Sequence, residues 1–176
     1  MEPANTVAVT PSSVGMRYGL LTGLVSVIIS FGLYALQLEQ NSYLRFITTV
    51  VLIVGIVLAQ REYKNLNGGF MSYGEGLTIG ALVSVVVGVL GAAFVYVYTT
   101  FIDPETMTRT MDKARADMEA KGTMSDAQID QAMAFSTKFT SGPILLVFVI
   151  LGTLFMGFLA SLIISAFVKN PKPEFE

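Results

Sequence analysis

Long uncharged stretches divide the chain into four apolar segments with polar segments between them. Residues 18–38, 76–102 and 143–168 contain no Asp, Glu, Lys or Arg. A helix of about 20 residues rises about 30 Å, the thickness of the hydrocarbon core, so each of these segments is long enough to cross a bilayer. With a shorter segment at 46–60, the pattern predicts an all-α membrane protein with four transmembrane helices.

The second segment is the weakest of the four. The uncharged stretch between Arg45 and Arg61 covers only residues 46–60. As a helix, this stretch would be roughly 22 Å long. Such a segment crosses only if both arginines reach back to water or the bilayer thins locally. A re-entrant or interfacial helix is the alternative.

The third segment is predicted to be the helix on which the other spans pack, because its small residues recur at every fourth position. That spacing places them along one side of a helix, where a neighbouring backbone can approach closely. The first and last segments carry the same spacing, which predicts helix packing through small residues. The predicted packing positions are Gly15, Gly19, Gly23, Gly76, Gly80, Ser84, Gly88, Ala92, Gly157, Ser161 and Ser165.

Outside these segments the chain is polar. Residues 1–16 and 170–176 are expected to be flexible tails on either side of a membrane domain that covers 17–169. Residues 61–75 are expected to be a linker, with a turn at 67–69, because the sequence Asn-Gly-Gly there favours a turn.

Residues 103–138 form the longest polar segment. Met107, Met111 and Met118 recur there at helical spacing with charged residues between them. This is the pattern of an amphipathic helix, predicted over 104–121.

A second short helix is predicted to follow it. Gly122 suits the residue after a helix end, and Ser125 with Gln128 has the spacing of a capping box. The helix would cover about 126–138 and turn Met133 inward. The two together predict a soluble helical hairpin between the third and fourth spans.

Composition agrees with a membrane protein and excludes several functions. Hydrophobic residues make up 53% of the chain and charged residues 14%, against about 25% charged in soluble domains. A net charge of −2 gives no basic surface for nucleic acid. Since cysteine and histidine are both absent, no metal site and no cofactor is expected.

No catalytic constellation is evident. The four predicted spans contain no ionisable side chain other than tyrosine, whereas pumps and coupled transporters ordinarily place charged residues within the membrane. Glu75 and Asp103 lie at opposite ends of the third span, too far apart to act together. The chain is therefore not expected to be an enzyme.

Two sets of residues are candidates for a role. Arg17 and Glu75 stand at the starting ends of the first and third spans, where they could form an ion pair or point separately into the headgroups. A further set could be a partner surface, a Cu(I) site or simple packing between the two hairpin helices. It consists of Met107, Met111, Met118 and Met133.

Basic residues near the span ends predict the orientation, because cytoplasmic loops are enriched in lysine and arginine. Four spans place both termini and the 61–75 linker on one side. That side carries Arg17, Arg61, Lys64, Lys169 and Lys172, and the other carries Arg45 and Lys138. The termini are therefore expected in the cytoplasm and the hairpin 103–138 on the outer, periplasmic side.

Three motifs carry a resemblance to a known family. They are F-M-S-Y-G-E-G-L-T-I-G before the third span, Y-V-Y-T-T-F-I-D-P-E at its exit and G-F-L-A-S-L-I-I-S-A-F-V-K-N at the end of the last. The chain, from about Gly15 to Lys169, resembles the bacterial membrane family catalogued as domain of unknown function 4199. The resemblance implies an inner-membrane protein of four helices with a soluble segment between the last two. It implies no activity and no catalytic residue.

Three functions follow from these observations. The favoured one is a non-enzymatic helical bundle that assembles with, or stabilises, another membrane protein or copies of itself. The alternative is an oligomeric small-solute channel or a lipid-handling protein. An enzyme whose acidic residues gather only in an oligomer is the third.

Overall fold

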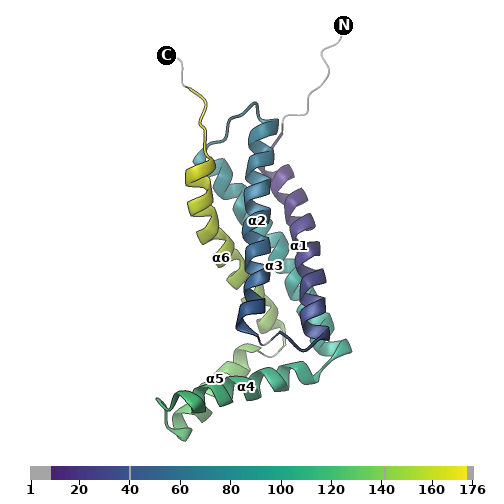
Figure 1. The fold of residues 1–176 in the computed structure, drawn as a ribbon, viewed down its shortest axis with the longest axis vertical. Coiled ribbons are helices and arrows are strands. Elements are labelled where there is room, and N and C mark those ends of the chain that lie inside the picture. Colours follow the sequence, from purple (N-terminus) through teal and green to yellow (C-terminus); the bar gives the residue numbers. More distant parts are fainter. Residues whose placement is uncertain (1–8, 40, 141, 174–176) are drawn as a thin grey trace.

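The computed structural model describes residues 9–39, 41–140 and 142–173, and within them it contains six α-helices (Figure 1). Four of the helices are long and apolar enough to cross a membrane, which confirms the predicted all-α class. The helices are α1 (Pro11–Ala35), α2 (Ser42–Leu66), α3 (Tyr73–Val97), α4 (Glu105–Lys121), α5 (Asp126–Thr140) and α6 (Pro143–Val168), and a π-helical turn, η1 (Tyr98–Ile102), follows α3.

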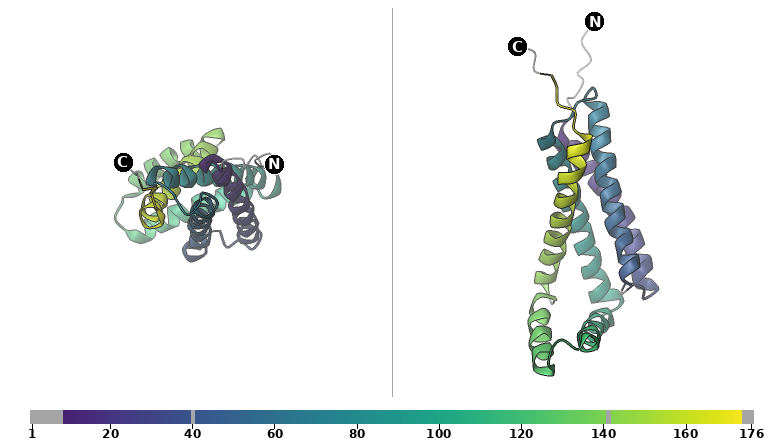
Figure 2. Two further views of the ribbon diagram at one scale, coloured as in Figure 1. Left: turned by 90° about the horizontal axis from the view of Figure 1, so that it is seen from above. Right: turned by 60° about the vertical axis from the view of Figure 1, so that its left-hand side comes forward.

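The third helix, α3, is the centre of the bundle. It packs against α1, α2 and α6, whereas α1 and α6 lie on opposite sides of it and do not contact each other within the described residues. The view from above shows the same arrangement, with α1 and α6 at the two sides of the group (Figure 2). The core lies where α2 and α3 meet, and it includes Ile56, Ile79 and Val83, each 0% exposed.

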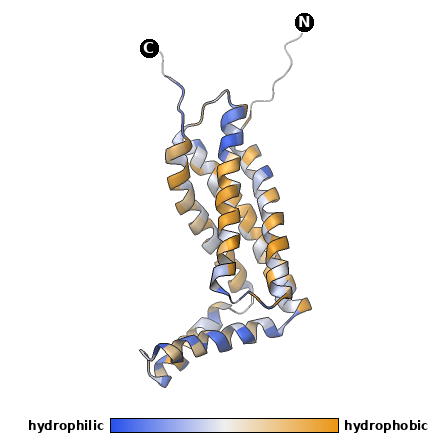
Figure 3. Cartoon of the chain, viewed as in Figure 1, coloured by the Kyte–Doolittle hydropathy of each residue, from blue (hydrophilic) through white to orange (hydrophobic). Residues whose placement is uncertain are grey.

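The two ends of the bundle differ. Both ends of the chain leave it at one end, and α4 and α5 extend from the other (Figure 1). We call α4, α5 and the turn between them (residues 105–140) the arm. Colouring by hydropathy shows apolar helices in the body of the bundle, polar residues at the end where α2 finishes, and a largely polar α4 (Figure 3).

Helix α1 begins earlier than expected. Residues 11–16 were assigned to a flexible tail, but the helix starts at Pro11. Thr10 is the N-cap, since its hydroxyl oxygen accepts a hydrogen bond of 3.2 Å from the Ser13 backbone N–H, and Pro11 follows at the first helical position. This is the combination that starts helices. The outer parts of the expected tails, residues 1–8 and 174–176, lie outside the described residues.

Helix α2 is longer than its uncharged core. It continues through Leu66, so the expected linker 61–75 shortens to the residues after it, and the part suited to crossing a membrane is Phe46–Leu66. The extension is stabilised because Tyr63, only 2% exposed, packs in the core while Arg61 points outward. The expected turn at 67–69 does follow, with φ values of 68° and 88° at its two glycines.

The helices of the arm begin and end close to the expected residues. Helix α4 ends at Lys121, and Gly122 adopts a left-handed φ of 62°. The Gln128 side-chain oxygen accepts a hydrogen bond of 2.9 Å from the Ser125 backbone N–H, as in a capping box. Among the described helices, α4 contacts only η1 and α5, and α5 contacts only α4 and α6.

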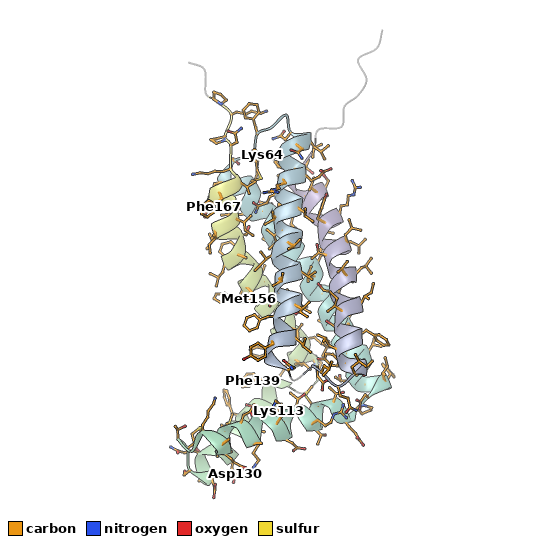
Figure 4. The ribbon with its side chains drawn as sticks, viewed as in Figure 1. Lys64, Lys113, Asp130, Phe139, Met156 and Phe167 are labelled. Atoms are coloured by element: carbon orange, nitrogen blue, oxygen red, sulfur yellow. The ribbon has the colours of Figure 1, made fainter. Side chains whose placement is uncertain are left out.

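The outer faces of the bundle are apolar. Only 11% of the most apolar stretch of α6 is buried within the chain. Phe167 is 85% exposed and Met156 is 50% exposed, and both are labelled on α6 in Figure 4. Such surfaces are stable in hydrocarbon rather than in water.

Candidate functional site

The interface between α3 and α6 is formed by small side chains. A methyl group on Gly76 would lie 2.6 Å from Ser165 Oγ, and one on Gly80 would overlap Ser161 Oγ. Further along the antiparallel pair, a methyl group on Gly157 would overlap Ser84 Oγ. Each close approach therefore pairs a glycine on one helix with a serine on the other, and this lets the two backbones come together.

This interface ends at Gly88. A methyl group there would lie 3.2 Å from Ile150 Cα on α6 and 3.3 Å from Thr153 Cβ. The next small residue along the stripe, Ala92, is 3% exposed. Beyond it, α3 passes into η1.

Helix α1 packs on a different face of α3. Three of the four glycines of α1 receive large side chains of α3 that are spaced four residues apart, so these close approaches join glycine to Leu or Val and not glycine to glycine. A methyl group would lie 2.9 Å from Leu82 Cβ at Gly15, 2.8 Å from Val86 Cβ at Gly19 and 2.5 Å from Leu90 Cδ1 at Gly23.

A close contact between α1 and α2 was not predicted from the sequence. Gly55 of α2 faces Thr22 of α1, and a methyl group on Gly55 would overlap the threonine side chain. Thr22 is 6% exposed. No repeated spacing indicates this contact, because Gly55 is a lone glycine among valine and isoleucine residues.

The most buried polar group joins three helices. Gln60 of α2 is 0% exposed, and its Nε2 donates to the Gly76 carbonyl of α3 at 3.0 Å and to Ser165 Oγ of α6 at 2.9 Å. Ser161 Oγ also lies 3.2 Å from this nitrogen. Because a carbonyl can only accept, the amide nitrogen must be the atom that faces Gly76. The other amide atom, Oε1, is buried and has no partner in the described structure.

Next to this group, α2 and α3 are joined at their ends. The hydroxyl of Tyr63 donates a hydrogen bond of 2.5 Å to Glu75 Oε1. The other carboxylate oxygen accepts from the Ser72 backbone N–H at 2.7 Å, and Ser72 Oγ accepts from the Glu75 backbone N–H in return. Glu75 thus completes the capping box of α3, whose N-cap is Ser72, and also accepts the hydrogen bond from Tyr63 of α2.

Arg17 does not form with Glu75 the ion pair that the sequence left open as one of two arrangements. It is exposed, and the ion pairs among the described residues all lie between residues 103 and 130. The reason is helical geometry: Arg17 is two positions from Gly15 and Gly19, about 200° around α1 from the face that packs on α3. The carboxylate of Glu75 binds Tyr63 instead.

The residues after α6 are bound to the α2–α3 turn. Met71 and Asn170 exchange two backbone hydrogen bonds of 2.8 Å, and the Asn170 side chain donates to the Gly69 carbonyl at 2.8 Å. Lys64 Nζ donates to the Val168 carbonyl at 3.0 Å, which satisfies an acceptor at the C-terminus of α6. Asn170, expected in a flexible tail, is therefore ordered.

At the other end, charged residues hold the start of the arm. Arg109 forms an ion pair of 2.5 Å with Asp103, just after η1, and its Nη2 lies 3.1 Å from Thr106 Oγ1. The Arg109 guanidinium holds the pKa of Asp103 below its usual range. Both Asp103 and Glu39, in the α1–α2 connection, raise the pKa of Arg109. Electrostatic attraction therefore draws α4, η1 and this connection together.

The four methionines of the expected partner surface are half-buried. Met107 and Met111 line an open apolar pocket of about 240 Å³ at the foot of the arm, whereas Met118 and Met133 lie further along it. The methionines thus do not form one continuous exposed surface. The pocket is lined by Tyr96, Thr99, Thr100, Met107, Met111, Thr137, Gly142, Leu145 and Leu146.

The contacts of these groups are packing contacts, hydrogen bonds and ion pairs. Across the described ranges, no three acidic side chains come close enough together to hold a metal ion. Gln60 and Tyr63 are the polar residues that sequence reasoning missed, and a lone amide in an apolar stretch was the pattern that could have revealed the first of them.

Comparison with known proteins gives a family but no activity. Neither a curated protein nor a solved structure matches the sequence. Residues 17–170 match the family described as "Protein of unknown function (DUF4199)". That match covers most of the chain and agrees with the motifs before, after and within the apolar helices. The chain therefore belongs to the DUF4199 family, and with four membrane-length helices it fits a multi-pass membrane protein.

Proposed function

We propose that this protein is a non-enzymatic helical bundle of a bacterial inner membrane, and that it assembles with another integral membrane protein, or with a second copy of itself, through the arm. The observation that carries the proposal is the way the arm is attached. Among the helices of the described structure, its two helices contact the bundle only through η1 and α6, at the foot of the arm.

An arm attached in this way has little to stabilise it. Helix α4 has 17 residues and α5 has 15, little more than the length of about 12–15 residues below which even alanine-rich isolated helices are marginal in water. Ile129, 2% exposed, is the one buried residue among the side chains of α5 that the structure describes, and Phe135 on the same helix is 63% exposed. A partner that covers Phe135 would supply the missing apolar contacts.

The position of the arm supports the same proposal. In the view of Figure 4 the turn between α4 and α5 lies to the left of the lower end of the bundle, and the labelled Asp130 marks this outer part of the arm. A membrane protein that packed against the exposed face of α6 would therefore lie next to the arm.

The test is photo-cross-linking in living cells followed by purification in mild detergent and mass spectrometry. A photoreactive residue in place of Phe135 is expected to capture one defined membrane protein, or this chain itself, and the same residue in place of Asp117 is the control. Asp117 is also exposed but lies on α4. Capture at neither position, together with a purified protein that is alone and monomeric, would refute the proposal.

The proposed orientation has its own test, with the termini in the cytoplasm and the arm in the periplasm. The chain contains no cysteine, so a single introduced cysteine is the only thiol. Ser125→Cys in the arm should react with a membrane-impermeant maleimide added to intact cells, and Ser12→Cys in the first turn of α1 should react only after lysis. The reverse pattern would place the arm in the cytoplasm.

A further inference from the structure

The pocket at the foot of the arm lies where α3 and α6 cease to be joined by small residues. Their close contact runs from Gly76 with Ser165 to Gly88 with Ile150. Beyond that point Tyr96 on α3 and Leu145 on α6 are opposite walls of one pocket. The two helices therefore separate toward the arm, and the pocket occupies the space between them.

The π-helical turn shapes one wall. The Asp103 backbone N–H donates to the Tyr98 carbonyl at 2.8 Å, five residues earlier, which makes a wider turn than an α-helix. Thr99 and Thr100 of this turn line the pocket. Met107 and Met111 of α4 close it on the side of the arm, and methionine side chains adapt to irregular apolar shapes.

The lining suits a hydrocarbon. None of the residues that line the pocket is charged. The hydroxyl of Thr99 donates to the Val95 carbonyl at 2.8 Å, and that of Thr137 donates to the Met133 carbonyl at 2.9 Å. Two of the few polar groups in the wall are thus already bonded within their own helices.

The size of the pocket, about 240 Å³, also suits a hydrocarbon chain. An apolar cavity of about 150 Å³ holds a benzene molecule, so this pocket is large enough for several methylene groups in a row.

The pocket is also continuous with surface that suits lipid. Tyr96 is 47% exposed, and Ile144 and Val147, next to the lining residues of α6, are 48% and 53% exposed. All three belong to helices long and apolar enough to cross a membrane. A chain lying against this surface can enter the pocket without crossing water.

We propose that this pocket binds the part of a phospholipid acyl chain nearest its headgroup, from the leaflet next to the arm. The arm stands at the end of the membrane-length helices, which is the depth of the headgroups and of the first methylene groups. The bound chain fills the space between α3 and α6 and contacts Met107 and Met111 of the arm.

The test uses the full chain reconstituted in vesicles of phosphatidylethanolamine and phosphatidylglycerol. A trace of phospholipid carries a photoreactive diazirine near the carbonyl end of one acyl chain, and labelled peptides are mapped by mass spectrometry. Label is expected to concentrate in the peptides that contain Met107, Met111 and Leu145.

Two variants fill the pocket from opposite walls, Met111→Trp from α4 and Leu146→Trp from α6. Both are expected to lose the concentrated label, while Met118→Trp, on the same helix as Met111 but outside the pocket, keeps it. Equal labelling of all exposed apolar helices would overturn the proposal. So would label that persists in both pocket variants, or a cross-link showing a protein segment in the pocket.

Discussion

The side-chain amide of Gln60 on α2 donates a hydrogen bond of 2.9 Å to Ser165 Oγ on α6, although the two residues are more than a hundred positions apart in the chain. The same nitrogen bonds the Gly76 carbonyl of α3. One side chain thus joins three helices in a region where each of its neighbours is otherwise apolar or small. Buried polar groups of this kind fix how helices are positioned along one another.

Replacement of Gln60 separates the effect of shape from that of hydrogen bonding. Gln60→Met keeps the length of the side chain and removes the orphaned Oε1 along with the donor, so we expect a loss of about 1 kcal/mol or less in the free energy of unfolding. Gln60→Glu should cost more, by a further ~1–3 kcal/mol, because an ionised carboxylate cannot donate to the Gly76 carbonyl. Equilibrium unfolding in mixed detergent micelles measures both.

The order of these two variants is the critical result. A Gln60→Glu protein as stable as Gln60→Met at neutral pH would mean that the amide does not donate to Gly76. The hydrogen-bonded cluster would then not contribute to joining α2, α3 and α6.

Gly80 tests the packing of α3 against α6. Gly80→Ala places a methyl group in the space of Ser161 Oγ, and overpacking of this kind typically costs about 1–3 kcal/mol. Gly91→Ala on the same helix is the matched control, since nothing lies within 4 Å of the added methyl group. Alanine favours a helix over glycine, so the control should be as stable as the wild type or slightly more stable.

A double variant makes the same test specific to the pair. Ser161→Gly removes the side chain that Gly80→Ala would strike, so the cost of the two changes together should be smaller than the sum of their separate costs. Strict additivity would show that Gly80 and Ser161 do not meet.

The overall fold could be predicted from the sequence because its strongest constraints are local. Charge-free length defines a span wherever the solvent is hydrocarbon, and Gly122 and the Ser125–Gln128 pair mark helix ends through their own hydrogen bonds. The four-residue spacing of small residues likewise indicated which faces approach closely.

The structure differs from the sequence predictions where tertiary contacts override local composition. Helix α2 continues past the charge of Arg61 because Tyr63, two residues further on, is buried in the core. Hydropathy gives no information on that contact. The possible ion pair of Arg17 and Glu75 is not formed, because closeness to a span end does not determine direction around the helix. Glu75 is bound to Tyr63, a residue placed in a linker by its charged neighbours.

The position of the pocket depends on where α3 and α6 separate. The spacing of residues along the sequence carries no information on that. The spacing of Met107 and Met111 correctly placed them on one face of a helix. Their position against Tyr96 and Leu145 results from the π turn and from the end of the small-residue interface. Neither feature is a repeat that can be read from the sequence.

Within the arm, the buried residue Ile129 should contribute more to stability than the ion pair between Arg115 and Asp130. Ile129 is 2% exposed, and large-to-alanine changes at such positions cost about 2–5 kcal/mol. Ile129→Ala should therefore loosen α4 and α5 and speed tryptic cleavage after Lys121 while the bundle stays folded. Asp130→Ala removes an exposed pair with Arg115 of 2.8 Å, and since such pairs contribute at most about 1 kcal/mol, cleavage should change little. Equal acceleration by both variants would show that the charges, not Ile129, hold the arm together.

The ionisation of Asp103 makes the stability at the start of the arm depend on pH. Its pKa is lowered in the folded protein, chiefly by the hydrogen bond from Arg109, so the folded state binds a proton less readily than the unfolded state. The stabilisation from Asp103 is complete above the ordinary aspartate pKa of about 3.9 and is lost as the pH falls through the lower, folded value. The difference in thermal midpoint between the wild type and Asp103→Asn should therefore be constant near neutrality and disappear in acid.

Asp117→Asn is the control, because Asp117 lies 4.0 Å from Lys113 in an exposed pair and should show little difference from the wild type at any pH. A difference for Asp103→Asn that persists unchanged into strong acid would mean that the ion pair with Arg109 does not hold the arm.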